Sequence, residues 1–144
     1  MAECLFCRIV AGEVAAHVVL SNLECVAFLD HRPLFPGHCL LVPRIHVETF
    51  SELRNGLVGP LFETAQLMTN AVEAAMEAEG SFLAINNKVS QSVPHLHIHI
   101  VPRRRKDGLR GFFWPRSKYK TPEEMFLVAE LISTKIKELT SGAV

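Results

Sequence analysis

The sequence predicts an α+β domain, in which an antiparallel sheet is combined with separate helices, and three observations lead to this class. Five short apolar runs, most of them β-branched, are separated by links of hairpin length, which is typical of antiparallel strands. Two longer segments instead carry apolar residues at spacings of three and four, which is typical of helices. The 144 residues are 49% hydrophobic and 21% charged, a globular composition that excludes disordered, collagen-like and coiled-coil chains.

The predicted strands are bounded by turn-forming residues. The first two are joined by the polar sequence SNLE and form a hairpin. Residues 30–37 contain two prolines and a glycine and predict a loop, and Pro43 ends the strand that follows. The polar residues 86–94 separate the last two strands. The five predicted strands are residues 17–20, 25–29, 38–42, 81–85 and 96–101.

Two helices are predicted from their apolar spacing and their end signals. The first covers residues 57–79 and is expected to stop at Gly80. The second begins with a capping box, in which Thr121 is the N-cap, Pro122 the first helical residue and Glu124 the third. The apolar residues that place the first helix against a core are Val58, Leu61, Phe62, Ala65, Met68, Val72, Ala75 and Met76.

Charge is balanced overall but unevenly distributed. Fifteen basic residues cancel fifteen acidic ones, so no net charge draws the whole chain to nucleic acid or membrane. Residues 103–120, however, contain eight basic residues and one acid, with Phe112, Phe113 and Trp114 among them. The aromatic side chains are expected to pack on the protein or on a dimer partner, and the arginines are candidates to bind an anionic ligand.

The location of the protein is predicted from what the chain lacks. No apolar run approaches the ~20 residues that span a bilayer. The first residues, MAECLFCRIVAGE, have no basic start followed by an apolar stretch and do not resemble a signal peptide. A cytoplasmic protein is therefore expected, in which the four cysteines are free thiols or metal ligands rather than disulfides.

Three of the seven histidines alternate with apolar residues in the sequence HLHIHIVP. On a strand, His95, His97 and His99 project from one face, while the intervening residues enter the core. An ordinary strand with a polar outer side is the structural alternative. Three imidazoles on one face, each needing hydrogen-bond partners, instead favour a metal site or a site of nucleophilic and acid–base chemistry.

The pair Cys4-x-x-Cys7 is a weaker signal, with three interpretations. It could be a redox pair, two free thiols near a terminus, or half of a zinc site that takes two further ligands from elsewhere. The redox interpretation expects the motif at the start of a helix after a strand, and only three residues precede Cys4. Cys25 and Cys39 lie in apolar runs and are expected in the core.

Four segments together resemble the histidine triad family. HLHIHIVP resembles its signature, PGHCLLVPRIHV its second block, CLFCRIVAGE the N-terminus of its zinc-bearing members, and FLDHRP its nucleoside-binding segment. The similarity covers residues 3–103 in register. It implies a five-stranded antiparallel sheet with a long central helix and a C-terminal helix, one domain over residues 1–144 with a basic, aromatic tail from residue 104, and pairing as a homodimer.

The resemblance also implies a nucleotide hydrolase or transferase. His97 would attack the α-phosphate and form a covalent nucleotidyl-histidine intermediate, which water then releases; no metal is needed at phosphorus. Dinucleoside polyphosphates, nucleoside phosphoramidates and adenylates are the implied substrates. The other implied roles belong to His99 at the scissile phosphate, His38 in the polar network, Asp30 at the ribose, and Asn86 (or Asn87), Gln91 and Ser92 at phosphate or leaving group.

The zinc-bearing members of the family further imply a structural zinc ion held by Cys4, Cys7, His46 and His95. One departure from the family is the loop NNKVSQ, which is shorter than usual and has no glycine. His17 and His31 are expected at surface or structural positions, with His31 able to border the nucleoside.

Two alternatives to this enzyme are kept. One is a nucleotide-binding or scaffolding protein with negligible turnover. The other is a deadenylase of nucleic-acid ends, which the basic segment suggests; nucleic acid is nevertheless not the expected partner, because 144 residues leave no room for a separate DNA-binding domain.

Overall fold

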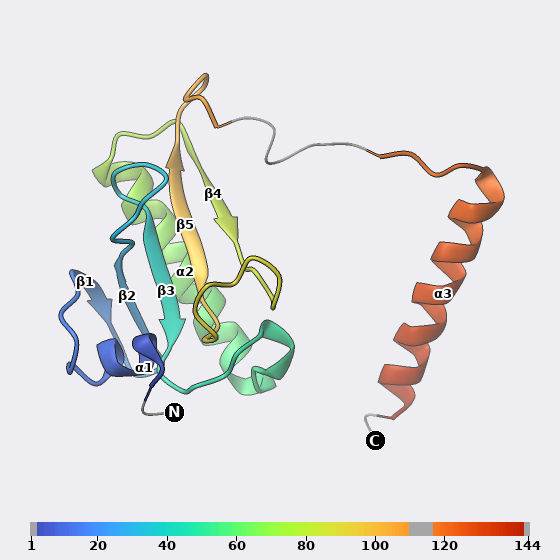
Figure 1. Cartoon of the computed structure of the whole chain (residues 1–144), viewed down its shortest axis with the longest axis horizontal. Helices are drawn as coiled ribbons and strands as arrows, with labels where there is room; N and C mark the ends of the chain where they lie inside the picture. The colour runs from blue at the N-terminus through green and yellow to red at the C-terminus, as the bar shows by residue number, and fades with distance from the viewer. Residues whose placement is uncertain (1–2, 110–116, 143–144) are drawn as a thin grey trace. The chain divides into compact units, whose positions relative to one another are not determined.

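The computed structural model describes residues 3–109 and 117–142, and the chain divides into two compact units, Met1–Asp107 and Gly108–Val144. Residues 110–116, which include Phe112, Phe113 and Trp114 of the basic segment, lie outside the described residues. The elements of the first unit are α1 (Leu5–Val10), β1 (Val18–Ser21), β2 (Cys25–Leu29), β3 (Cys39–Pro43), a 3-10 turn (Phe50–Glu52), α2 (Asn55–Ala75), β4 (Gly80–Ala84) and β5 (Ile98–Arg103) (Figure 1).

The five strands form one antiparallel sheet in the order β1-β2-β3-β5-β4, which confirms the predicted fold class. β3 pairs with both β2 and β5, and therefore lies at the centre. Its register places Leu40 opposite His99 and Leu41 opposite Ile98. Because side chains alternate along a strand, His99 shares a face with Leu40, and Ile98 shares the other face with Leu41.

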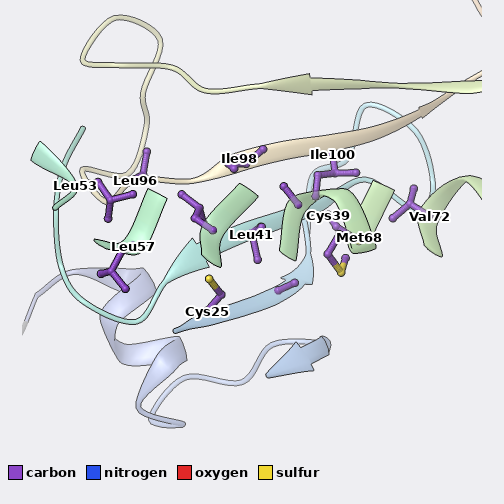
Figure 2. Packing of buried hydrophobic residues seen from close by; sticks show 13 residues of the cluster. Cys25, Cys39, Leu41, Leu53, Leu57, Met68, Val72, Leu96, Ile98 and Ile100 are labelled. Carbon is purple, nitrogen blue, oxygen red and sulfur yellow. The ribbon is translucent and has the colours of Figure 1, made fainter. Parts of the chain in front are cut away.

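The helix α2 covers one face of the sheet and encloses the main core (Figure 1). Figure 2 shows Leu41, Ile98 and Ile100 from the strands beside Met68 and Val72 from the helix. The predicted helix is thus confirmed, but its predicted stop at Gly80 is wrong. The helix ends at Ala75 because Glu77 takes a left-handed backbone with φ of 49°, which frees Gly80 to begin β4.

The opposite face carries a smaller cluster that is completed by the N-terminal helix. Phe6 of α1 is buried together with Val26, Phe28, Leu40 and Val42. The sequence predicted no helix in the first dozen residues. α1 spans six residues and has no side-chain cap, so its packing through Phe6 stabilises it rather than a strong local signal.

The last strand begins two residues later than predicted, at Ile98 rather than Leu96. The residues before it are still held like a strand, because the N–H of Leu96 donates to the carbonyl of Val47 at 2.7 Å. Leu96 therefore enters the main core while His95 and His97 lie on the other face and are buried.

The second unit contains the helix α3 (Pro122–Ser141). As predicted, the Thr121 hydroxyl accepts the N–H of Glu124 at 3.0 Å, while the Glu124 carboxylate accepts the N–H of Lys120 instead of that of Thr121. Among the described residues, no helix combines the length and apolarity that crossing a membrane requires.

Candidate active site and metal centre

The orientation of His97 is set by the backbone of its own segment. Its Nδ1 lies 2.6 Å from the carbonyl oxygen of His95, and a carbonyl oxygen can only accept a hydrogen bond. Nδ1 therefore carries the proton, and in the neutral ring Nε2 holds a free lone pair. The ring of Phe6 meets the imidazole edge to face, with centroids 5.2 Å apart, and further restricts it. This orientation leaves Nε2 with the free lone pair that a nucleophile requires.

His99 and His38 lie next to this ring. His38 Nε2 is 3.0 Å from His99 Nδ1, and the centroids of His97 and His99 are 4.9 Å apart. Burial, and then the neighbouring rings of His97 and His38, lower the pKa of His99 to about 4. Burial also lowers the pKa of His38, against the opposing effect of Asp30. Both rings are therefore neutral near pH 7.

The histidines open onto a cavity of about 660 Å³. His97, His99, Asp30 and Ser92 lie along one part of its wall. Side chains from α1, the following loop and the sheet form an apolar part, which suits a flat aromatic ligand. The apolar residues lining it are Leu5, Phe6, Ile9, Val14, Ala15, Ala16, Phe28, Leu29, Leu40 and Val93.

The Pro-Gly-His block positions His38 through a close backbone approach. Gly37 has a φ of 95°, and a Cβ atom there would lie 2.5 Å from Cγ of Met76. Only glycine meets both conditions without moving the Met76 side chain. His38, the next residue, is consequently held at the start of β3 with its side chain 3% exposed.

In the loop before His95, the side-chain amides of Asn87 and Gln91 bond to backbone groups of the protein. Gln91 accepts the N–H of Lys88 and donates to the carbonyl of Glu48, while Asn87 accepts the N–H of Phe50. Asn86 and Gln91 are not among the described residues that line the cavity, whereas Ser92 is. The loop contains no glycine, and Lys88 and Ser90 instead take the positive φ values of 68° and 60°, which side chains rarely adopt.

A second group of donors lies at the other end of the histidine segment. The ligand atoms of Cys4, Cys7, His46 and His95 all fall within 4.8 Å of one another. His95 Nε2 donates to the carbonyl of Pro43 at 2.8 Å, so its Nδ1 presents a lone pair to both sulfur atoms. The four residues named from the sequence are therefore brought together.

The distances within this group fit a tetrahedral metal ion. Nδ1 of His95 lies 3.5 Å from each cysteine sulfur, and Nδ1 of His46 lies 3.3 Å from Sγ of Cys7. A tetrahedron with Zn–S of about 2.3 Å and Zn–N of about 2.0 Å has N···S edges of about 3.5 Å. These three N···S distances match the tetrahedral edge, so the group could hold a metal ion.

Three residues that line the cavity were not among the site residues predicted from the sequence. Phe6 packs on His97 and lines the cavity, and its only sequence signal is its place between the two cysteines. His17 and His31 also line the cavity; the sequence placed them at surface or structural positions. His31 is exposed and lies 3.9 Å from Asp30, which agrees with a place beside the nucleoside.

Comparison with known proteins identifies the family of this chain. A family model described as the HIT domain matches residues 11–106, which is more than half of the chain. The chain is 31% identical over 136 residues to the adenosine 5'-monophosphoramidase of Schizosaccharomyces pombe, covering 94% of this chain and 99% of that one.

Two solved structures are similar over nearly the whole chain. A HIT family protein from Bacillus subtilis is 31% identical with a TM-score of 0.83, over 92% of this chain and 96% of that one. A zinc-bound histidine triad family protein from Mycobacterium smegmatis is 29% identical with a TM-score of 0.71, over 92% and 98%. With its alternating histidines, its five-stranded sheet and the match of the family model, the chain belongs to the histidine triad (HIT) family.

Proposed function

We propose that the protein is a nucleotide hydrolase or transferase that acts on the α-phosphate of small nucleotides. The observation that carries this proposal is the hydrogen bond from His97 Nδ1 to the carbonyl of His95, which leaves the Nε2 lone pair at the cavity. A relative named as an adenosine 5'-monophosphoramidase supports a nucleoside phosphoramidate as substrate. Dinucleoside polyphosphates and adenylates have the same reacting phosphorus and are the other proposed classes.

The proposed reaction proceeds in two steps. His97 Nε2 forms a bond to the α-phosphorus while the bond to the leaving group breaks, giving a nucleotidyl-histidine. Water then attacks the same phosphorus, the P–N bond breaks, and the nucleoside monophosphate leaves. Asp30 binds the ribose, His99 donates a hydrogen bond in the region of the scissile bond, and Ser92 meets the charge on the phosphate oxygens. Gln91 and Asn86 have weaker support as ligand contacts: neither is among the described residues that line the cavity, and Gln91 already bonds to Lys88 and Glu48.

Trapping the intermediate tests this proposal. Wild-type protein mixed with adenosine phosphoramidate and quenched in acid-free denaturant should gain the mass of one adenylyl group, located on His97. His97→Asn should show no adduct and lose at least ~10³-fold in kcat. His31→Asn, a matched change at an exposed histidine, should still form the adduct. Nucleotide binding without any adduct or turnover would instead favour the scaffolding alternative.

We also propose that the metal group holds a structural zinc ion through Cys4, Cys7, His46 and His95. When bound, zinc would supply a cross-link between the N-terminal segment and the segment before β5, with all four positions taken by protein. Support comes from the N···S distances and from the zinc-bound relative. Elemental analysis of metal-replete protein should find one zinc per chain, and a clearly lower content would contradict the assignment.

The deadenylase alternative has less support. The first basic residues of the segment 103–120 already bond to neighbouring groups of the protein. Arg103 forms a bidentate pair with Asp107, and Arg105 lies 2.9 Å from Glu79. Arg104 donates to the carbonyl of Met76. A cytoplasmic homodimer that uses neither nucleic acid nor membrane remains our proposal, which light scattering of the purified protein and cell fractionation would test.

A further inference from the structure

The protonation of His38 is set from outside the histidine cluster, by the loop that joins β2 to β3. The N–H of Leu34 donates to His38 Nδ1 at 3.0 Å. A nitrogen that accepts this hydrogen bond carries no proton, so the neutral His38 ring keeps its proton on Nε2. The lowered pKa of this buried side chain agrees with a neutral ring.

That proton determines the tautomer of His99. His38 Nε2 lies 3.0 Å from His99 Nδ1, whereas the nearer Asp30 oxygen is 3.6 Å away. His38 therefore donates to His99, whose Nδ1 must present its lone pair. The neutral His99 ring then carries its proton on Nε2. Because His99 lines the cavity, this N–H is the polar group that it offers to a ligand.

Neighbouring rings on one face of the segment thus present opposite groups. His97 offers a lone pair, because its Nδ1–H is bound to the carbonyl of His95. His99 offers an N–H, because its Nδ1 accepts from His38. A phosphate needs this combination: a nucleophile for the phosphorus and a hydrogen-bond donor for an oxygen or the leaving atom.

The loop that carries Leu34 is itself held at both ends. The N–H of Asp30 donates to the carbonyl of His38 at 2.9 Å, and the N–H of His38 donates to the carbonyl of Phe35 at 3.0 Å. The N–H of Arg32 donates to Oδ1 of Asp30 at 2.9 Å. The direction of the Leu34 amide is therefore a property of a closed loop.

We propose that the backbone amide of Leu34 is a positioning group that makes His99 a donor toward the leaving atom on the reacting phosphorus. The inference rests on the proposed function, and it adds a residue outside the histidine motif. Without this amide, His38 would also be stable with its proton on Nδ1. His99 could then keep its own proton on Nδ1 and turn a lone pair toward the lone pairs of the phosphate, which repel it.

The wild-type protein provides the first test, because nitrogen NMR of ¹⁵N-histidine-labelled protein distinguishes the two tautomers of a neutral ring. At pH 7 we expect Nε2–H for both His38 and His99, and Nδ1–H for His97. A proton on Nδ1 of either His38 or His99 would overturn the proposal. This result does not depend on whether any nucleotide is turned over, so it separates failure of the inference from failure of the proposed function.

The second test removes the amide proton. Leu34→Pro has no N–H, and Leu34→Ala keeps it while removing the same exposed side chain. For adenosine phosphoramidate, whose amine leaves poorly, Leu34→Pro should lower kcat roughly ten-fold with little change in KM. A p-nitrophenyl ester of AMP, whose leaving group is stable as an anion, should be much less affected. Leu34→Ala should match the wild type on both substrates.

Equal losses on both substrates would show a general structural effect and contradict the proposal. If Leu34→Pro does not fold, His38→Gln and His38→Met give the same comparison. Gln places an N–H near the position of Nε2, and Met places none. Recovery of phosphoramidate turnover by Gln relative to Met supports the chain of hydrogen bonds, whereas indistinguishable variants would overturn it.

Discussion

Two groups of donors each include histidines of the segment 95–99, and they differ in where their lone pairs point. In the metal group (Cys4, Cys7, His46 and His95), the outer nitrogen of His95 donates to the Pro43 carbonyl, so the free lone pairs converge on one point. In the triad cluster (Asp30, His38, His97 and His99), the Nδ1 lone pairs of His38 and His99 already accept N–H groups of the protein.

Proximity alone therefore does not separate a metal site from a hydrogen-bond network. The ligand atoms of Asp30, His38 and His99 also lie within 4.8 Å of one another, which is close enough for a metal ion. Binding through Nε2 of His38 would require a proton on Nδ1, facing the N–H of Leu34. Two donors would then oppose each other at a buried position, which disfavours the metal.

The largest effect is expected from loss of the metal. Chelation, or Cys4→Ser, should lower the free energy of unfolding by about 4 kcal/mol relative to protein in free zinc at ~1,000 times its dissociation constant. Denaturant titration with and without chelator measures the difference. Cys39→Ala, a change at a buried cysteine outside the metal group, should keep its response to the chelator. A wild type that is indifferent to chelation would contradict a structural role.

The next effect separates the two groups by affinity. Competition titration with a zinc indicator should find one tight site per chain, with any second site at least ~100-fold weaker. His95→Asn should abolish the tight site, while Asp30→Asn and His99→Asn should leave it intact. A second tight site that disappears in Asp30→Asn would mean that the triad cluster is also a metal centre.

A smaller effect concerns the dependence of stability on pH. The pKa of His99 is about 4 in the folded protein and about 6.5, its ordinary value, in the unfolded chain. Between these values the unfolded state binds a proton that the native state does not. The contribution of His99 to the free energy of unfolding should therefore be constant above pH 6.5 and fall as the pH drops toward 4, by on the order of 2 kcal/mol after solvent screening of this half-buried ring.

Comparison with His99→Asn isolates this contribution, because the two proteins differ only in this side chain. The fall in stability between pH 6.5 and 4 should be shallower in the variant. Identical slopes would show that the imidazole of His99 titrates normally in the folded state.

The smallest effect on stability is expected in the loop that precedes His95. Lys88 takes a φ of 68°, which costs a side chain about 1 kcal/mol or more, so Lys88→Gly should be neutral or stabilise the protein by up to ~1 kcal/mol. Val89→Gly, at an exposed neighbour without a positive φ, should destabilise it by about 0.5–1 kcal/mol. Denaturant midpoints of the two variants measure both changes in stability. Equal destabilisation by the two changes would argue against strain at Lys88.

Much of the fold could be predicted because its signals are local. Alternation of apolar and polar residues placed His95, His97 and His99 on one face even though the strand itself begins only at Ile98. The hairpin, the long helix and the Thr121 cap also depend on neighbouring residues. α1 and the end of α2 were missed, because Phe6 is stabilised by a distant sheet face and Glu77 takes a backbone that side chains rarely adopt.

The sequence by itself determined which histidines share a face, because spacing along a strand decides where side chains project. Only the tertiary structure decided what each imidazole does there. The proton of a neutral histidine lies on whichever nitrogen faces an acceptor, and those partners come from other segments: the Pro43 carbonyl for His95 and the Leu34 amide for His38. The folded backbone therefore distinguishes a metal ligand from a hydrogen-bond donor among histidines that the sequence presents as equivalent.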